Sequence, residues 1–323
     1  MNRRAFVGFA TVGVASSYAV TKLGGGQQAP LADGPHGDSA VAILKAESYS
    51  ADLVRVMLDG AKACGLDVRC KRVLLKPNLV EFDATTAINT DPRVIAAAYE
   101  VMRTLGAAEV WIGEGPGHRR DTYDLADQAR YFETIPSFER IFTDLNRDDV
   151  SPVKNFAGED RFYFPNTALR ADVVVSLAKM KTHHWAGATL AMKNFFGLVP
   201  GSVYGWPKNK LHFIGIDEAI VALNRTFRKT FAIVDGIIGM EGNGPIQGSP
   251  KHAGVLVMGS DLVSVDATCC RIMGIDPEKV GYLRMAADLG HVRASRIQQR
   301  VERIDAVRTP FVLIERFQGL RLV

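Results

Sequence analysis

The sequence contains no Cys-x-x-Cys pair, and its only cysteines are Cys64, Cys70, Cys269 and Cys270. It therefore lacks the ligand spacing of a zinc ribbon or of a ferredoxin-type iron–sulfur cluster. Adjacent Cys269 and Cys270 lie in an apolar helical pattern, which predicts two buried thiols. Cys64 and Cys70 could form a disulfide in an exported protein, but their spacing does not decide between a disulfide and free thiols.

The chain also lacks a strong charge of either sign. Its formal net charge is +4 over 323 residues, and it contains no arginine-rich run. Proteins that bind nucleic acid through a basic face need such clustered charge, so this class of partner is excluded. A 47% apolar and 23% charged composition is typical of a globular protein with a good core, and the length favours two lobes.

The N-terminus carries a twin-arginine pattern, Asn2-Arg3-Arg4-Ala5-Phe6-Val7, followed by an uncharged run over residues 5–21. That run is short for a membrane span but suits a signal peptide, and a Gly- and Pro-rich linker follows it. We expect export by the twin-arginine machinery to the periplasm, with the signal either cleaved or kept as a membrane anchor. We divide the chain into a signal and linker (1–37), an N-terminal α/β lobe (38–212) and a C-terminal α/β lobe (213–323).

Strand and helix patterns alternate along the first lobe. Buried strands are expected at 40–46, 72–75, 109–113 and 171–177, with helices at 50–65, capped by Ser50, and at 92–105, capped by Asp91. A β-α-β-α-β order predicts a mainly parallel sheet with helices on both faces. The fold class is therefore α/β with two lobes and a site in the cleft between them.

The second lobe has a more mixed pattern. The expected elements are helices at 214–227, 261–274 and 277–289, and strands at 231–235, 254–259 and 311–315. Residues 236–248 contain five glycines and a proline, a composition that predicts irregular structure there.

The stretch 173–212 holds five lysines and three histidines but no carboxylate. Such a segment suits an anionic ligand, a metal or both, and open α/β sheets hold ligands beyond the carboxyl ends of their strands. The candidate substrate-binding residues are Lys76, Asn78, Arg119, Lys179, Lys181 and Asn194.

Three residues of the candidate site suit proton transfer: His118, His183 and Lys193. Histidine is a common general acid or base, and a lysine among other cations has a lowered pKa and becomes a better nucleophile. His184 competes with His183 for the base position. The alternative interpretation is that His118 lies in a solvated turn and that the lysines form a solvated basic face.

Acidic residues in the second lobe complete the candidate site. Asp235 and Glu241 could bind a divalent metal together with His212. Alternatively, they could orient the histidines as supporting hydrogen-bond partners. Asp266 lies in an apolar helix, where it either points at the glycine-rich loop that carries Asp235 and Glu241 or accepts internal hydrogen bonds.

Several of these motifs resemble the family known as domain of unknown function 362. The resemblance covers about residues 40 to 290 and is carried by Lys76-Pro77-Asn78, the lysine/histidine stretch, Lys193-Asn194 and Asp235-Gly236 through Met240-Glu241-Gly242-Asn243-Gly244-Pro245. Members of that family often carry a fused ferredoxin module, for which this chain has no cysteine pattern.

A more distant resemblance is to the lactate racemase family that uses a nickel-pincer nucleotide. It is carried by Gly117-His118-Arg119, His183-x-x-Ala186-Gly187 with Lys193 ten positions on, Pro200-Gly201 and His212. The resemblance implies that His118 and His183 are alternating acid and base, that Lys193 bonds the cofactor and that His212 ligates nickel. In place of that family's glycine pair this chain has Leu190-Ala191-Met192.

Together these features favour an exported enzyme that transfers a proton or hydride on a small anionic carboxylate, of the isomerase or oxidoreductase type. One alternative is an extracytoplasmic binding protein for a small anion or metal. Another is an accessory protein of iron–sulfur electron transfer. The sequence does not name the substrate, the metal or the oligomeric state.

Overall fold

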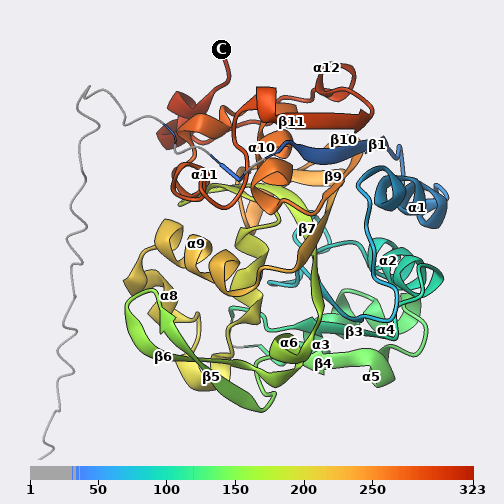
Figure 1. Ribbon diagram of the computed structural model, residues 1–323, viewed down its shortest axis with the longest axis vertical. Coiled ribbons are helices and arrows are strands. Elements are labelled where there is room, and N and C mark those ends of the chain that lie inside the picture. Colours follow the sequence, from blue (N-terminus) through green and yellow to red (C-terminus); the bar gives the residue numbers. More distant parts are fainter. Residues whose placement is uncertain (1–30, 32–33, 36, 119) are drawn as a thin grey trace, which may run out of the picture. The chain divides into compact units, whose positions relative to one another are not determined.

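A computed structural model describes residues 31, 34–35, 37–118 and 120–323 of the chain (Figure 1). Residues 31–323 form one compact unit. The predicted export signal and Arg119 lie outside the described residues. Within the part that is described, no helix combines the length and the apolar character needed to cross a membrane.

The unit is built on one nine-stranded sheet with the order β11-β1-β10-β9-β7-β2-β3-β4, and β8 pairs with β7 beside this path. Most neighbouring pairs are parallel, whereas β10 is antiparallel to both β1 and β9, and β8 to β7. The strands are β1 (Ser39–Lys45), β2 (Arg72–Pro77), β3 (Glu109–Glu114), β4 (Phe142–Asp144), β7 (Val173–His183), β8 (Gly187–Thr189), β9 (Thr230–Asn243), β10 (Gln247–Gly259) and β11 (Ile297–Val301).

This sheet is continuous across residue 212, where the sequence suggested a boundary between two lobes. β7 from the first segment pairs with β9 from the second, and β1 lies between β10 and β11. A separate antiparallel hairpin is formed by β5 (Val150–Phe156) and β6 (Glu159–Pro165).

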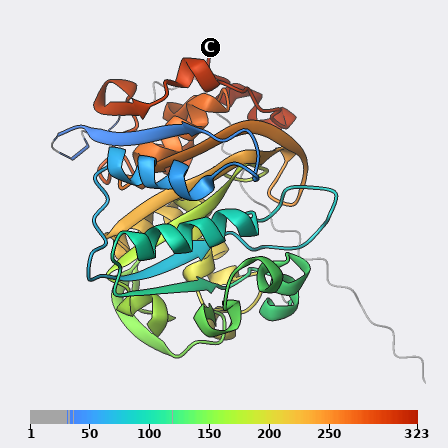
Figure 2. The same ribbon diagram turned by 90° about the vertical axis from the view of Figure 1, so that its right-hand side faces the viewer.

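Helices cover both faces of the sheet, as predicted (Figures 1 and 2). One core packs α1 (Leu53–Ala63) and α2 (Pro92–Thr104) on the sheet, and the other packs α9 (Ile216–Thr226), α10 (Leu262–Ile272) and α11 (Gly281–Met285). Alternate strand residues divide between the two cores, because successive side chains of a strand point to opposite faces. In β7, Val174 joins the second core and Val175 the first.

Shorter helices connect these elements. They are α3 (Thr122–Gln128), α4 (Tyr131–Thr134), α5 (Phe138–Ile141), α6 (Asn166–Arg170), α7 (Gly201–Tyr204), α8 (Asn209–Ile214), α12 (Ile304–Val307) and the 3-10 segments η1 (Lys193–Leu198), η2 (Pro277–Lys279), η3 (Ala294–Arg296) and η4 (Glu315–Leu320). Asp91 caps α2 as predicted, by accepting the Arg93 N–H, but α1 is capped by Asp52 instead of Ser50.

The prediction of irregular structure at 236–248 was wrong, since β9 runs to Asn243 and β10 begins at Gln247. Two of the glycines are needed because neighbouring backbone approaches closely. A Cβ on Gly239 would lie 2.6 Å from the Met180 carbonyl oxygen, and one on Gly244 would lie 2.1 Å from that of Thr182. Close backbone approach explains these two glycines, whereas Gly242 adopts a positive φ of 82° that favours glycine.

Two predictions near the C-terminus were also wrong. Residues 311–315 do not form a strand but make one isolated bridge, Leu313 to Gly242, while β11 takes the sheet position beside β1. The helix expected at 277–289 is divided into η2 and α11. All four cysteines are free thiols, with Cys269 and Cys270 buried as predicted.

Candidate functional site

The candidate site is organised by the extra length of β7. β7 continues to His183, whereas its pairing with β2 ends where Leu177 faces Pro77. Alternate residues of a strand share one face, so Lys179, Lys181 and His183 all point to the same side beyond the end of β2. All three are buried. The predicted basic loop is therefore a buried strand whose polar side chains need partners inside the protein.

Lys76, the last lysine of β2, is paired with a carboxylate. Its ammonium donates to Glu114 on β3, to the Pro77 carbonyl oxygen at 2.6 Å and to Asn194 Oδ1 at 3.3 Å. Burial lowers the pKa of Lys76, and the charge of Glu114 opposes that shift. The Asn194 amide in turn donates to the Lys76 carbonyl at 2.8 Å, which joins η1 to β2.

Lys179 is also paired. Its Nζ lies 2.7 Å from Asp235 Oδ2 on the adjacent strand β9 and 2.9 Å from the Tyr49 hydroxyl. Tyr49 donates to the same carboxylate, which also accepts the backbone N–H groups of Asp91 and Ile237. Burial and the charge of Asp235 raise the pKa of Tyr49 far above its usual range, so this hydroxyl stays protonated.

Lys181 has three oxygen partners and no carboxylate. Its Nζ donates to Asn78 Oδ1 at 2.7 Å, to the Ile88 carbonyl at 2.8 Å and to the Pro245 carbonyl at 3.3 Å. Burial lowers the pKa of Lys181 well below its usual value, and the neighbouring charge of Lys179 adds to the effect. Lys181 therefore ties the segments that follow β2 and β9 to the middle of β7.

Lys193, the first residue of η1, is different. Its Nζ lies 4.1 Å from the centre of the Phe196 ring and has neither a hydrogen bond nor an ion pair with any residue the structure describes. Burial lowers the pKa of Lys193 to about 8, and the nearby carboxylate of Asp217 opposes that shift. Near neutral pH the side chain is thus a cation whose N–H groups are all available to a ligand.

The two adjacent histidines present opposite chemistry. Nδ1 of His183 accepts the backbone N–H groups of Trp185 (3.0 Å) and Ala186 (3.1 Å), so the neutral ring carries its proton on Nε2. Nδ1 of His184 lies 2.7 Å from the Gly244 carbonyl oxygen, which can only accept, so Nδ1 carries the proton and Nε2 keeps a lone pair. His183 is a hydrogen-bond donor and His184 an acceptor or base.

Two further side chains of this segment have a buried polar atom. Thr189 Oγ1 has no hydrogen-bond partner among the described residues, and the His212 ring interacts with the backbone of Lys208, one turn earlier at the start of α8. Thr189 faces Lys181 across the β7–β8 pair, so its side chain points to the same side as Lys181 and His183. Lys193 lowers the pKa of both His183 and His212, in each case after the larger effect of burial. We call Lys193, His183, His184, Thr189 and His212 the Lys193 cluster.

Aromatic contacts make this cluster continuous. The rings of His183 and His184 stack with centroids 4.9 Å apart, and Trp185 contacts His184 at 4.7 Å and His212 at 5.5 Å. The Phe196 ring contacts both the Lys193 ammonium at 4.1 Å and the His212 ring at 6.4 Å between centroids. Trp185 is 52% exposed, so the cluster reaches the protein surface at this residue.

Comparison with known proteins identifies the family. The profile of the family described as "Domain of unknown function (DUF362)" matches residues 73–271, which is more than half of the chain and includes the whole Lys193 cluster. The chain belongs to this family. A curated protein of Synechocystis sp., described as thylakoid-associated, is 27% identical over 262 residues, which cover 78% of this chain and 79% of that protein.

Two solved structures are similar to this DUF362 protein. The lactate racemase apoprotein from Thermoanaerobacterium thermosaccharolyticum matches with a TM-score of 0.42 and 12% identity over 67% of this chain. A crystal structure of a Thermotoga maritima protein matches with a TM-score of 0.36 and 15% identity over 64% of it. The chain spans about half the length of each, 54% and 55%.

The DUF362 fold brings some predicted site residues together and leaves others apart. His183, Lys193 and His212 converge, whereas His118 is exposed and has no side-chain contact with the cluster among the described residues. The loop that carries His118 follows β3, which is separated from β7 by β2. The predicted pairing of His118 with His183 therefore has no geometric support in the structure.

The three predicted metal ligands do not form one group. Asp235 is occupied by Lys179 and Tyr49, and Glu241 accepts the Val312 N–H at 2.9 Å and lies 3.7 Å from the Lys251 ammonium. Over the described ranges no three histidine, cysteine or carboxylate side chains lie close enough together to hold a metal ion. Asp235 serves as the partner of a buried lysine, as its position beside β7 requires.

Sequence reasoning missed Glu114, Tyr49 and Thr189 and left the role of Asp266 open. The fully buried carboxylate of Asp266 accepts the N–H groups of Ala191 at 2.8 Å and Met192 at 3.1 Å, the two residues just before Lys193. Burial raises the pKa of Asp266 to about 7, and these hydrogen bonds oppose the shift. The interpretation as an internal hydrogen-bond acceptor is confirmed, because the carboxylate binds these two N–H groups and the Tyr282 hydroxyl, while none of its hydrogen bonds among the described residues is to the glycine-rich residues 236–248. A carboxylate in an otherwise apolar helix was the available signal.

Proposed function

We propose that the Lys193 cluster binds the carboxylate of a small organic acid and that the protein catalyses proton transfer at the adjacent carbon. The observation that carries the proposal is the Lys193 ammonium, which has no counter-charge within bonding distance among the described residues and lies close enough to His183 and His212 to lower the pKa of both. An unpaired cation attracts an anion, and the buried Thr189 Oγ1 without a partner on β8 also favours a missing ligand. Because Lys193, Thr189 and His183 Nε2 all offer donors, that ligand is an acceptor and an anion.

In this proposal His184 is the general base. Its Nε2 lone pair removes the proton from the carbon next to the carboxylate, and the electron pair moves onto the carboxylate oxygens, where Lys193 stabilises the added charge. The Gly244 carbonyl accepts from Nδ1–H and favours the protonated ring that forms. Return of the proton from His184 gives exchange at that carbon, and inversion follows when water protonates the opposite face of the intermediate while His184 releases its proton to solvent; neither outcome changes the redox state.

Hydride transfer is the second possibility, because Lys193 and His212 also suit the nickel-pincer nucleotide of the resemblance described above. A free amine and an imidazole ring are the donors that such a group needs. Lys193 would attach it and His212 would ligate its metal; when bound, it would supply a hydride acceptor. Intact mass and elemental analysis of protein from its native host test this assignment through an adduct on Lys193 and bound nickel.

Hydrogen–deuterium exchange tests the proton-transfer proposal without knowledge of the product. The purified protein is incubated in D2O with a panel of 2-hydroxy and 2-aryl carboxylates, and loss of the proton at the second carbon is followed by NMR. We expect exchange for at least one acid, its loss in His184→Gln and Lys193→Ala, and its retention in His118→Ala. Binding of acids without any exchange would instead make this a binding protein.

A further inference from the structure

A hollow in the described part of the protein lies away from the Lys193 cluster. Two cavities of about 320 and 250 Å³ share Phe82, Asp91, Pro92, Arg93 and Ala129, so they are compartments of one cleft. The outer compartment reaches Gln128, Arg130 and Thr134 near α4, and the inner one reaches Tyr49 and Lys179. No residue of the Lys193 cluster lines either compartment. A cleft of this combined size is large enough for a small organic molecule.

Arginine side chains supply unused donors in this cleft. Arg93 donates from Nε (2.8 Å) and Nη2 (2.7 Å) to Asp91, and Arg130 donates from Nε (2.8 Å) and Nη2 (2.7 Å) to Glu133. A guanidinium has five N–H groups, and Nη1 of each of these arginines has no partner in the ranges the structure covers. The carboxylate of Asp91 is engaged by Arg93 on both oxygens. The cleft therefore offers donors to a ligand more readily than acceptors.

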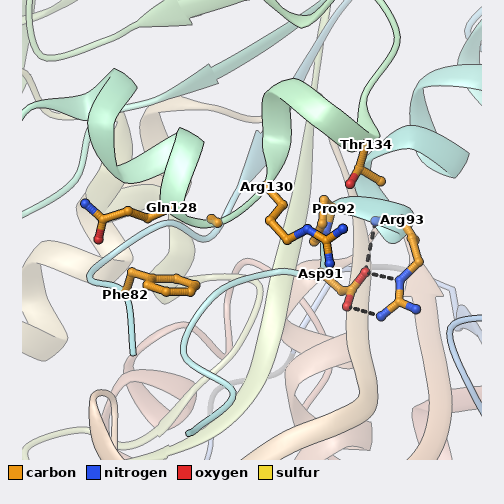
Figure 3. A pocket seen from close by; sticks show the side chains of 8 residues that line it. Phe82, Asp91, Pro92, Arg93, Gln128, Arg130 and Thr134 are labelled. Carbon is orange, nitrogen blue, oxygen red and sulfur yellow. Dashed lines mark hydrogen bonds and ion pairs between the residues drawn. The ribbon is translucent and has the colours of Figure 1, made fainter. Parts of the chain in front are cut away.

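An aromatic surface lies beside these donors. Phe82 is 37% exposed and belongs to both compartments. Figure 3 shows its ring on one side of the cleft and the Asp91–Arg93 pair on the other, with the Arg130 side chain extending between them in this view. Arg130 has a φ of 62°, a left-handed conformation that is uncommon outside glycine and that fixes the direction from which its side chain leaves the backbone. A planar group can stack on the exposed ring while its charge meets the guanidinium groups.

We propose that this cleft is a second binding site, which takes a planar aromatic ring carrying an anionic group. A carboxylate or a phosphate would bind to the Nη1 groups of Arg93 and Arg130, and the ring would stack on Phe82. Nucleoside monophosphates and aryl carboxylates share this chemistry. The site is independent of proton transfer at Lys193.

Calorimetric titration of the full-length protein tests the proposal with four probes. AMP and benzoate each carry a ring and a charge, adenosine has only the ring, and inorganic phosphate has only the charge. We expect AMP or benzoate to bind at least tenfold more tightly than adenosine and phosphate. A preference for AMP over benzoate would identify a nucleotide, and the reverse an aryl acid. Failure of both AMP and benzoate to bind would overturn the proposal.

Variants locate the binding and separate it from the Lys193 cluster. Arg130→Gly removes the guanidinium and suits the left-handed backbone, and Phe82→Ala removes the ring; each is expected to weaken binding about tenfold. Arg140→Ala, an exposed arginine outside the cleft, is the matched control and should bind as the wild type does. Lys193→Ala should also keep full affinity. Unchanged binding in both cleft variants, or its loss in Lys193→Ala, contradicts the assignment.

Discussion

The buried lysines of the sheet and the lysine of η1 show two uses of the same side chain. Lys76 and Lys179 are each paired with one carboxylate from a neighbouring strand, Glu114 and Asp235. Lys193 has an aromatic ring beneath it and no carboxylate within bonding distance among the described residues. Buried ion pairs satisfy one another and leave nothing for a ligand, whereas an unpaired cation is costly unless a ligand binds it. This difference separates Lys76 and Lys179, which stabilise the fold, from Lys193, which we propose binds a ligand.

Removing the carboxylate partner of a buried lysine should have the largest effect on stability. Asp235→Asn leaves the Lys179 ammonium buried without a counter-charge, so we expect a loss of about 3–5 kcal/mol in the free energy of unfolding. Urea denaturation measures it. The double variant Lys179→Met with Asp235→Asn removes both charges but keeps an acceptor oxygen for the Tyr49 hydroxyl and the Asp91 and Ile237 N–H groups, so it should recover most of that stability. A single variant as stable as the wild type would show that this pair is not needed.

Removing the unpaired amine should affect binding and not the fold. Lys193→Met keeps the apolar contact with Phe196 but removes the charge, so carboxylate affinity should fall about 10- to 100-fold, the value of a charge-assisted hydrogen bond. We expect Lys193→Met to be at least as stable as the wild type near neutral pH, because no intramolecular ion pair is lost and burial disfavours the charged amine, whose pKa is lowered to about 8. Lys210→Met, at a lysine whose partner is Glu159, is the control for both measurements.

The pH dependence sharpens the same distinction. Because the pKa of Lys193 is about 8 in the folded protein, against 10.5 for an ordinary lysine, carboxylate affinity should fall as the pH rises through about 8. The folded state binds this proton less tightly than the unfolded state, so the Lys193 contribution to stability should rise between about pH 8 and 10.5. Calorimetric titration and urea denaturation from pH 6 to 10, each compared with Lys193→Met, measure the two trends. Affinity that is independent of pH in this range contradicts the assignment of Lys193.

The smallest effect on stability is expected at Asp266, which holds the backbone just before Lys193. Tyr282→Phe removes one hydrogen bond to the Asp266 carboxylate, so the pKa of Asp266 should rise above about 7, and stability at pH 8 should fall by about 1 kcal/mol. A carboxyl whose folded pKa is raised loses stability as the pH rises from about 4 through that pKa, so the loss should shrink at pH 5. NMR titration of the carboxyl and urea denaturation at both pH values test this.

Much of the fold could be predicted from local patterns. The strands at residues 40, 72, 109 and 171 and the cap at Asp91 follow from apolar runs and capping chemistry, which depend only on neighbours in the chain. The prediction for residues 236–248 was wrong because Gly239 and Gly244 leave room for carbonyl groups of β7. That contact joins residues about sixty positions apart, and no local pattern reports it.

The sequence by itself determined that this protein has an α/β sheet and a segment rich in lysine and histidine without acids. Only the tertiary structure decided which lysines find carboxylates, because Glu114 and Asp235 reach them across neighbouring strands. It also decided that His184 and not His183 exposes a lone pair, since one carbonyl oxygen at Gly244 sets the proton position. The sequence specifies which residue types are present, but the charge and protonation of a side chain depend on partners from distant parts of the chain, which only folding brings close.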